Sequence, residues 1–128
     1  MPVVVENGKI KVSTDFIDVS GTDAVVLYIC MPKYYKFVIK KLIIFNPDSA
    51  DHIVILGEYD TSRATWNRDK VIIKVPAGEI KQPSEKELPT SFVMTTDPST
   101  AILAWAAKLD APVTAKPVKI QAEFEVHR

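Results

Sequence analysis

Alternation of apolar and polar residues recurs along this chain and predicts β-strands. In the clearest run, residues 118–126, the apolar positions are Val118, Ile120, Ala122, Phe124 and Val126. Successive side chains of a strand point to opposite faces, so such a run has one face for a core and one for water. Residues 70–75 repeat the pattern, and residues 15–20 are a shorter candidate strand that is ended by the turn residues Ser20 and Gly21.

The N-terminal segment predicts a β-hairpin. Two short runs, residues 3–6 and 9–12, are separated by Asn7-Gly8, and both of these residues tolerate the positive φ that a two-residue type I′ turn requires. Directly opposed residues share a face, so one side is charged and the other apolar. The expected pairs are Glu6 with Lys9, Val5 with Ile10, and Val3 with Val12.

A change of apolar phase falls inside residues 36–45. The apolar positions of residues 37–39 are out of step with those of residues 42–44. One additional residue at Lys40 or Lys41 would bring them to the same face, and we therefore predict a β-bulge or tight bend there.

Residues 96–110 fit two kinds of structure. A helix would have Asp97 as N-cap and Pro98 at its first position, followed by an alanine-rich stretch. A buried strand over residues 101–108 fits the same apolar run. Predicted strands on either side favour the strand.

These segments predict the fold class. Residues 24–31 and 52–57 are apolar on both alternating faces, as in central strands buried on each side. The total is eight or nine short strands joined by connections rich in proline and aspartate. We expect an all-β, antiparallel, jelly-roll-like β-sandwich in one domain, residues 1–128.

The charge balance gives the chain no overall attraction to nucleic acid or to anionic lipid, so any such binding would be local. The 16 basic residues balance the 16 acidic ones. No segment approaches the roughly 20 apolar residues of a membrane span.

The single cysteine, Cys30, lies in an apolar run and fits a core position. The first residues have no basic leader before an apolar segment, so we expect synthesis in the cytoplasm without a signal peptide.

Catalytic chemistry has little support in the sequence. The two histidines, His52 and His127, form no cluster with cysteine or with each other. Asp48, Asp51 and His52 offer at most a weak chelate, and residues of this kind after a proline are more simply turn formers. Glycine-rich phosphate loops and nucleophile motifs are missing. We expect no enzyme and no cofactor.

A basic and aromatic segment is the first candidate for binding. Residues 33–41 interleave lysines with Tyr34, Tyr35 and Phe37, and single-stranded nucleic-acid binders use such a combination. The simpler interpretation is a strand with solvated lysines and a core Phe37. The neutral chain favours the simpler interpretation, and the lysines would also protect an exposed edge.

The second candidate is the polar segment of residues 57–70, which we expect to be a loop. It contains Tyr59, Arg63, Trp66 and Arg68, which are residue types enriched at binding hot spots. A tryptophan in a loop serves equally well to cover the end of a sandwich. A carbohydrate or protein partner would bind here first.

Four features follow one another along the chain: a proline-led turn at Pro32, a strand that ends at Asn46, a strand that ends in Val-Pro-Ala-Gly at residues 75–78, and a closing alternating strand. In this order they resemble a family of small jelly-roll modules of virions, especially of tailed bacteriophages. These modules serve as capsid decoration or cement proteins and as heads of tail fibres. The resemblance implies no catalysis, self-association as a trimer, and attachment to a capsid or tail in the virion.

The segment after this corner, residues 79–89, has only Ile80 and Leu88 as apolar anchors. We expect it to be an arm that reaches a neighbouring subunit, whereas the corner itself needs no ligand. Our first hypothesis is therefore a structural homo-oligomer that docks on a larger assembly. A carbohydrate-binding module comes second and a single-stranded nucleic-acid binder third.

Overall fold

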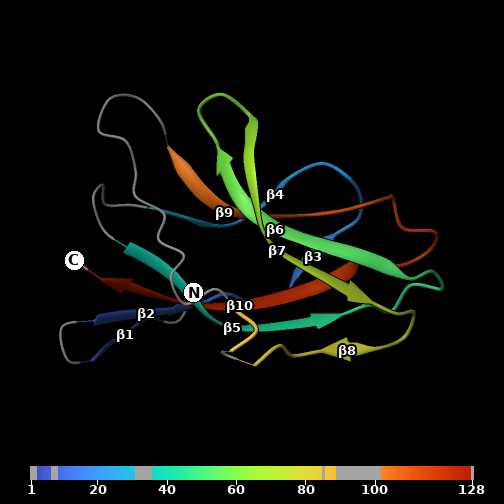
Figure 1. Ribbon diagram of the computed structural model, residues 1–128, viewed down its shortest axis with the longest axis horizontal. Helices are drawn as coiled ribbons and strands as arrows, with labels where there is room; N and C mark the ends of the chain where they lie inside the picture. Colours follow the sequence, from blue (N-terminus) through green and yellow to red (C-terminus); the bar gives the residue numbers. More distant parts are fainter. Residues whose placement is uncertain (1–2, 7–8, 31–35, 85, 89–101, 128) are drawn as a thin grey trace.

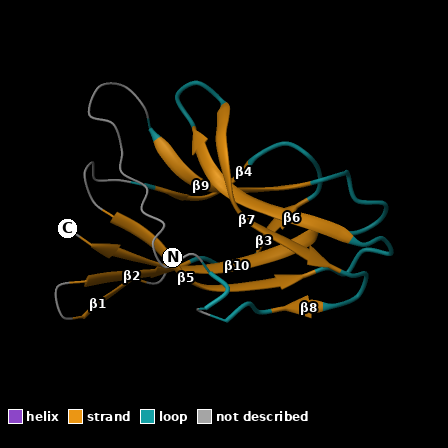
Figure 2. Ribbon diagram, viewed as in Figure 1, coloured by secondary structure: helices purple, strands orange, loops and turns teal. Residues whose placement is uncertain are grey.

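The computed structural model describes residues 3–6, 9–30, 36–84, 86–88 and 102–127. Within these ranges the chain forms ten strands in two antiparallel sheets that face each other (Figure 1). No helix occurs in the described part of the chain (Figure 2). The prediction of an all-β antiparallel sandwich is confirmed.

The first sheet is built around the C-terminal strand. Its members are β1 (Val3–Glu6), β2 (Lys9–Ser13), β3 (Ile17–Val19), β5 (Lys36–Phe45), β8 (Ile80–Lys81) and β10 (Val118–His127). The order is β1-β2-β10-β5-β8, and β3 pairs with β10 beyond the end of β2. Thr14, between β2 and β3, is held against β10: its backbone N–H donates to Ala122 O at 2.8 Å, and its Oγ1 accepts the N–H of Ala122 at 3.1 Å.

The second sheet has the order β4-β9-β6-β7. Its members are β4 (Val25–Ile29), β6 (His52–Asp60), β7 (Thr65–Val75) and β9 (Leu103–Leu109). The strand prediction for residues 101–108 is confirmed from Leu103 onward, and the helix alternative is wrong. The central position is confirmed for β6 but is wrong for β4, which forms an edge of the sheet and leaves Val26 and Ile29 partly exposed.

The core lies between the two sheets. Its largest fully buried side chains include Trp105, Phe37, Phe124, Ile39, Leu42, Ile44, Leu56, Leu109 and Ile120. Trp105 belongs to the second sheet and donates its indole N–H to the carbonyl oxygen of Phe37 in the first, at 3.1 Å. This bond satisfies a polar group that burial would otherwise penalise, and it joins the two layers.

The predicted registers are largely confirmed. In the hairpin, the opposed pairs of β1 and β2 are the three that were expected, while Asn7 and Gly8 lie outside the described residues. In the β5–β10 pair, Lys41 lies opposite Glu123 and Ile39 opposite Phe124, so Lys40 is the additional residue. The bulge therefore brings Phe37, Ile39, Leu42 and Ile44 together in the core, as predicted.

The Val-Pro-Ala-Gly corner is a turn held by the protein itself. Gly78 has a φ of 76°, and Glu79 N–H donates to Pro76 O at 3.1 Å, as in a turn that needs glycine at its third position. Buried Asn46 supports the corner, because its Nδ2 donates to the carbonyl oxygens of Val75 and Ala50, each at 2.9 Å. The corner thus needs no ligand, as the sequence indicated.

Candidate functional site

The segment expected to be a loop, residues 57–70, is mostly a β-hairpin. β6 runs to Asp60, a four-residue turn follows, and β7 starts at Thr65. The loop prediction is wrong because two bulges interrupt the apolar alternation by which strands are recognised. The register with β6 skips Lys70 at one bulge and Asn67 at the other.

Trp66 lies on the outer face of the second sheet. It is the cross-strand partner of Tyr59, and its ring covers Gly57 so closely that a Cβ there would lie 2.6 Å from Cζ2 of the indole. The indole N–H donates to Asp69 Oδ1 at 2.8 Å. The ammonium of Lys108, on β9, stands 4.2 Å from the ring centroid, which is a cation–π contact. Trp66 is therefore fixed in place by its neighbours.

A groove opens beside Trp66, with a volume of about 390 Å³. The residues that line it are Thr22, Asp23, Ala24, Tyr59, Ala64, Trp66 and Lys108. The structure thus brings together Tyr59 and Trp66, two residues that the sequence singled out. The sequence analysis missed Lys108 and Asp23, which come from distant parts of the chain. A glycine within an apolar strand was the available signal for Gly57, since it marks a close approach.

The two arginines of this hairpin do not line the groove. Arg63 Nη1 donates to Asp60 Oδ2 at 2.8 Å within the turn. Asp60 also accepts hydrogen bonds from Ser62, and these contacts, with that of Arg63, lower the pKa of its carboxyl. Arg68 Nε lies 3.7 Å from Glu58 Oε2. Both arginines therefore contribute to the hairpin itself.

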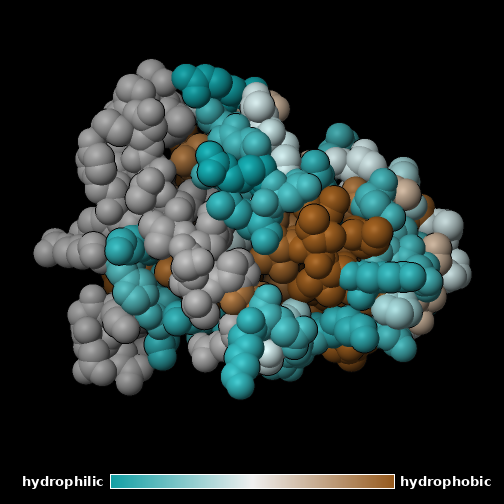
Figure 3. Space-filling model, in the orientation of Figure 1, coloured by the Kyte–Doolittle hydropathy of each residue, from teal (hydrophilic) through white to brown (hydrophobic). Residues whose placement is uncertain are grey.

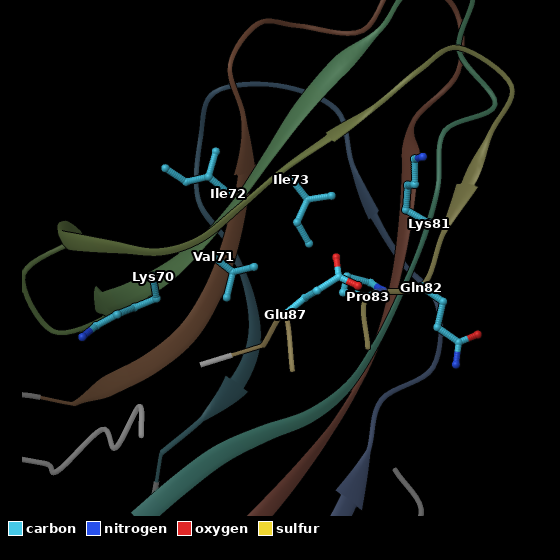
Figure 4. A pocket seen from close by; sticks show the side chains of 8 residues that line it. All are labelled: Lys70, Val71, Ile72, Ile73, Lys81, Gln82, Pro83 and Glu87. Atoms are coloured by element: carbon cyan, nitrogen blue, oxygen red, sulfur yellow. The ribbon is translucent and has the colours of Figure 1, made fainter. Parts of the chain in front are cut away.

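A second groove, of about 430 Å³, lies along one side of the sandwich. It runs between β7, the edge strand of the second sheet, and the segment after β8, the edge strand of the first. The residues that line it are Lys70, Val71, Ile72, Ile73, Lys81, Gln82, Pro83 and Glu87. Figure 4 shows Ile73 pointing across the groove toward Glu87 and Ile72 pointing to the other side of β7. The surface view shows an apolar patch over β7 with hydrophilic borders (Figure 3).

The expected arm folds back on its own domain. Residues 80–81 pair with β5 as β8, and Leu88 is only 3 % exposed within the core. The expectation that the segment has too few apolar groups to do so is therefore wrong, because one strand pair and one buried leucine suffice. Ile80, in contrast, is 64 % exposed and remains available to a partner.

The basic and aromatic segment is only partly described. Tyr34 and Tyr35 lie outside the described residues, and Phe37 is fully buried, so it offers no stacking surface. Lys36 and Lys41 are exposed on β5. The structure therefore favours the simpler interpretation for Phe37.

The candidate chelate around Asp48 and His52 instead links two loops of the protein. The buried carboxylate of Asp48 accepts hydrogen bonds from His52 Nε2 at 2.7 Å and from the backbone and side chain of Thr114, with further backbone donors at Ala115 and Lys116. These contacts, that of His52 foremost, hold the pKa of Asp48 well below its usual range. Its oxygens are thus used to join the loop after β5 to the loop before β10.

Other chemistry is scarce in the described ranges. No group of three or more His, Cys, Asp or Glu side chains there is placed to hold a metal ion. Burial raises the pKa of the Cys30 thiol to about 12, which makes it a poor nucleophile. No helix within those ranges is long and apolar enough to cross a membrane.

Comparison with known proteins gave no relative of this chain: no family model matches it, and neither a curated protein nor a solved structure is significantly similar.

Proposed function

We propose that this protein is a non-enzymatic structural module whose copies associate through the free edge of β7 and dock on a larger assembly such as a virus capsid or tail. The observation that carries the proposal is Ile72. This side chain is 62 % exposed in the second half of an eleven-residue strand, β7, which pairs with β6 and with no other described strand. Exposed apolar patches and unpaired strand edges are both typical of protein interfaces.

The positions of the lysines along β7 favour one of two registers in which the β7 edges of two copies could pair. Residues 71–75 continue the alternation beyond the bulge at Lys70. In an antiparallel pair of two such edges, a two-fold axis at Ile73 would place Lys74 opposite the partner's Ile72. An axis at Ile72 would place Lys70 opposite the partner's Lys74, and directly opposed like charges are destabilising. The first register is therefore the one we propose, and it gives an isologous contact.

This contact makes a dimer, whereas the resemblance to virion modules implies a trimer. Ile80 lies exposed at the edge of the other sheet and offers a further apolar contact for higher assembly. The same resemblance is what supports a capsid or tail as the larger assembly.

Sedimentation velocity over a hundredfold range of protein concentration tests the association. We expect the wild-type protein to associate and Ile72→Lys to shift it toward monomer. The matched control is Ile29→Lys, which adds the same charge at an apolar residue 46 % exposed on β4, the opposite edge of the sheet. Circular dichroism confirms folding of both variants. A wild-type protein that stays monomeric, or an Ile72→Lys protein that associates like the wild type, would contradict the proposal.

A further inference from the structure

The groove beside Trp66 lies on the outer face of the second sheet, away from the proposed contact at residues 71–75. Small residues form the sheet under it: Gly57 is opposite Ala106 in the β6–β9 pair, and Ala104 is opposite Tyr59. Side chains of this size leave room for aromatic rings above the backbone. The small side chains therefore leave a recess on the outer face of the sheet, whereas longer side chains would fill this space on an ordinary solvated face.

Several polar groups of the groove are not engaged by the described part of the chain. Among the described residues, the side chains of Thr22, Asp23 and Tyr59 take part in no hydrogen bond or ion pair. Lys108 makes a cation–π contact with Trp66 and takes part in no hydrogen bond or ion pair with the described residues. Together these residues present two hydroxyls, one carboxylate and one ammonium around a single volume of about 390 Å³. Convergent polar groups beside aromatic rings are typical of small-molecule sites.

The charges restrict the class of ligand. One acid and one base line the groove, so a phosphate or a sulfated ligand would gain from Lys108 but meet repulsion from Asp23. A purely apolar ligand would leave these groups desolvated and unpaired. A neutral sugar ring has an apolar C–H face for an aromatic ring, and its hydroxyls both donate and accept hydrogen bonds.

We propose that this groove binds a neutral glycan. Tyr59 supplies the stacking surface, because Lys108 already stands over the ring of Trp66. The carboxylate of Asp23 accepts hydrogen bonds from sugar hydroxyls, and the ammonium of Lys108 and the hydroxyl of Thr22 donate to them. Trp66 forms the wall and, being held by Asp69 and Gly57, keeps the recess open in the absence of ligand.

Isothermal titration calorimetry of the full chain with cello-, xylo-, manno-, malto- and chitohexaose tests this proposal. We expect at least one of these neutral sugars to bind, and Tyr59→Ala and Asp23→Ala each to weaken that binding roughly tenfold or more. The matched control is Phe16→Ala, an exposed aromatic that does not line the groove and should leave the affinity unchanged.

Three outcomes would overturn the proposal. One is that no hexasaccharide binds at about 5 mM, the weak end of measurable affinity. Another is that Asp23→Ala, at an exposed loop position that should not affect folding, binds as the wild type does. The third is binding of sulfated heparin hexasaccharide alone. A monomeric protein that binds a neutral glycan would support this inference while contradicting the proposed association, so the two are tested separately.

Discussion

The indole N–H of Trp66 donates a 2.8 Å hydrogen bond to Oδ1 of Asp69, three positions further along the same strand. In a regular strand, residues an odd number of positions apart point to opposite faces. The bulge at Asn67 shifts the alternation by one residue and brings both side chains to the outer face. The groove wall therefore depends on the bulge.

Gly57→Ala should displace Trp66. The new Cβ would overlap the carbonyl oxygen of Arg68 and lie 2.6 Å from Cζ2 of the indole, so both the strand and the ring would have to move. We expect a loss of at least about 2 kcal/mol in the free energy of unfolding, as in an overpacked core. We also expect a red shift of tryptophan emission. Urea denaturation and fluorescence measure the two effects.

Gly21→Ala is the control for this change. Nothing lies within 4 Å of a Cβ at Gly21, and its φ is outside the left-handed region. Its unfolding free energy should stay within about 0.5 kcal/mol of the wild type. Equal stability of both alanine variants would show that Trp66 does not pack on Gly57.

Ala64→Gly should stabilise the protein. Ala64 has a φ of 50° in the turn between β6 and β7, a region in which a Cβ costs roughly 1–2 kcal/mol. Glycine removes this strain, while the added freedom of the unfolded chain takes back about 0.5–1 kcal/mol. We therefore expect a net gain below about 1 kcal/mol, seen as a higher melting temperature.

The contrasting variant is Ala77→Gly. Ala77 is exposed in the corner after β7 and has no positive φ, so only the entropy of the unfolded chain changes. This variant should be slightly less stable than the wild type. If both substitutions lower the melting temperature, Ala64 is not strained in the folded protein.

The sequence predicted those parts of the fold that depend on regular alternation. The register of β1 with β2 followed from Asn7-Gly8, and the bulge at Lys40 followed from a change of apolar phase within one strand. In both places the local pattern and the tertiary packing require the same arrangement. The strand at residues 103–109 needed its neighbours as well, because its alanines fit a helix equally well.

The candidate groove was less predictable. Trp66 and Tyr59 are conspicuous by residue type. Their cross-strand pairing, however, depends on two bulges in a polar stretch that the sequence predicts to be a loop. Asp23 and Lys108 are brought to it by the β4–β9 pairing, which links residues about eighty positions apart. Leu88 was assigned to an arm because one buried leucine after a polar stretch carries no periodic signal.

Asn46→Ala should be strongly destabilising. The amide group of Asn46 donates to two carbonyl oxygens, and its Oδ1 accepts the backbone N–H of Asp48 at 3.1 Å. Alanine leaves these buried groups without partners, which we expect to cost about 2–4 kcal/mol in urea denaturation. Asn67→Ala removes one hydrogen bond from an exposed side chain to Glu58, whose carboxylate also lies near Arg68, and should cost less than about 1 kcal/mol. If the two variants lose comparable unfolding free energy, the three hydrogen bonds of Asn46 stabilise the corner no more than the single bond of Asn67 stabilises the hairpin.

Stability should fall in acid through Asp48. Its pKa in the folded protein lies well below the unfolded value of 3.8, because His52 and the loop around Thr114 donate to the charged form. A depressed pKa stabilises the folded state above the unfolded pKa, and this contribution is lost as the pH falls below about 4. The wild-type unfolding free energy should therefore drop steeply between about pH 5 and pH 2.

Asp48→Asn isolates this contribution. Asparagine cannot carry the charge, and its NH₂ would face groups that donate hydrogen bonds, so we expect lower stability at pH 7 and a shallower fall below pH 5. Asp23→Asn removes the same charge from an exposed side chain and should keep the wild-type profile. Urea denaturation from pH 2.5 to pH 7 measures all three proteins. If Asp48→Asn retained the full acid dependence, other carboxylates would have to account for it, and the contacts of Asp48 would then contribute to packing alone.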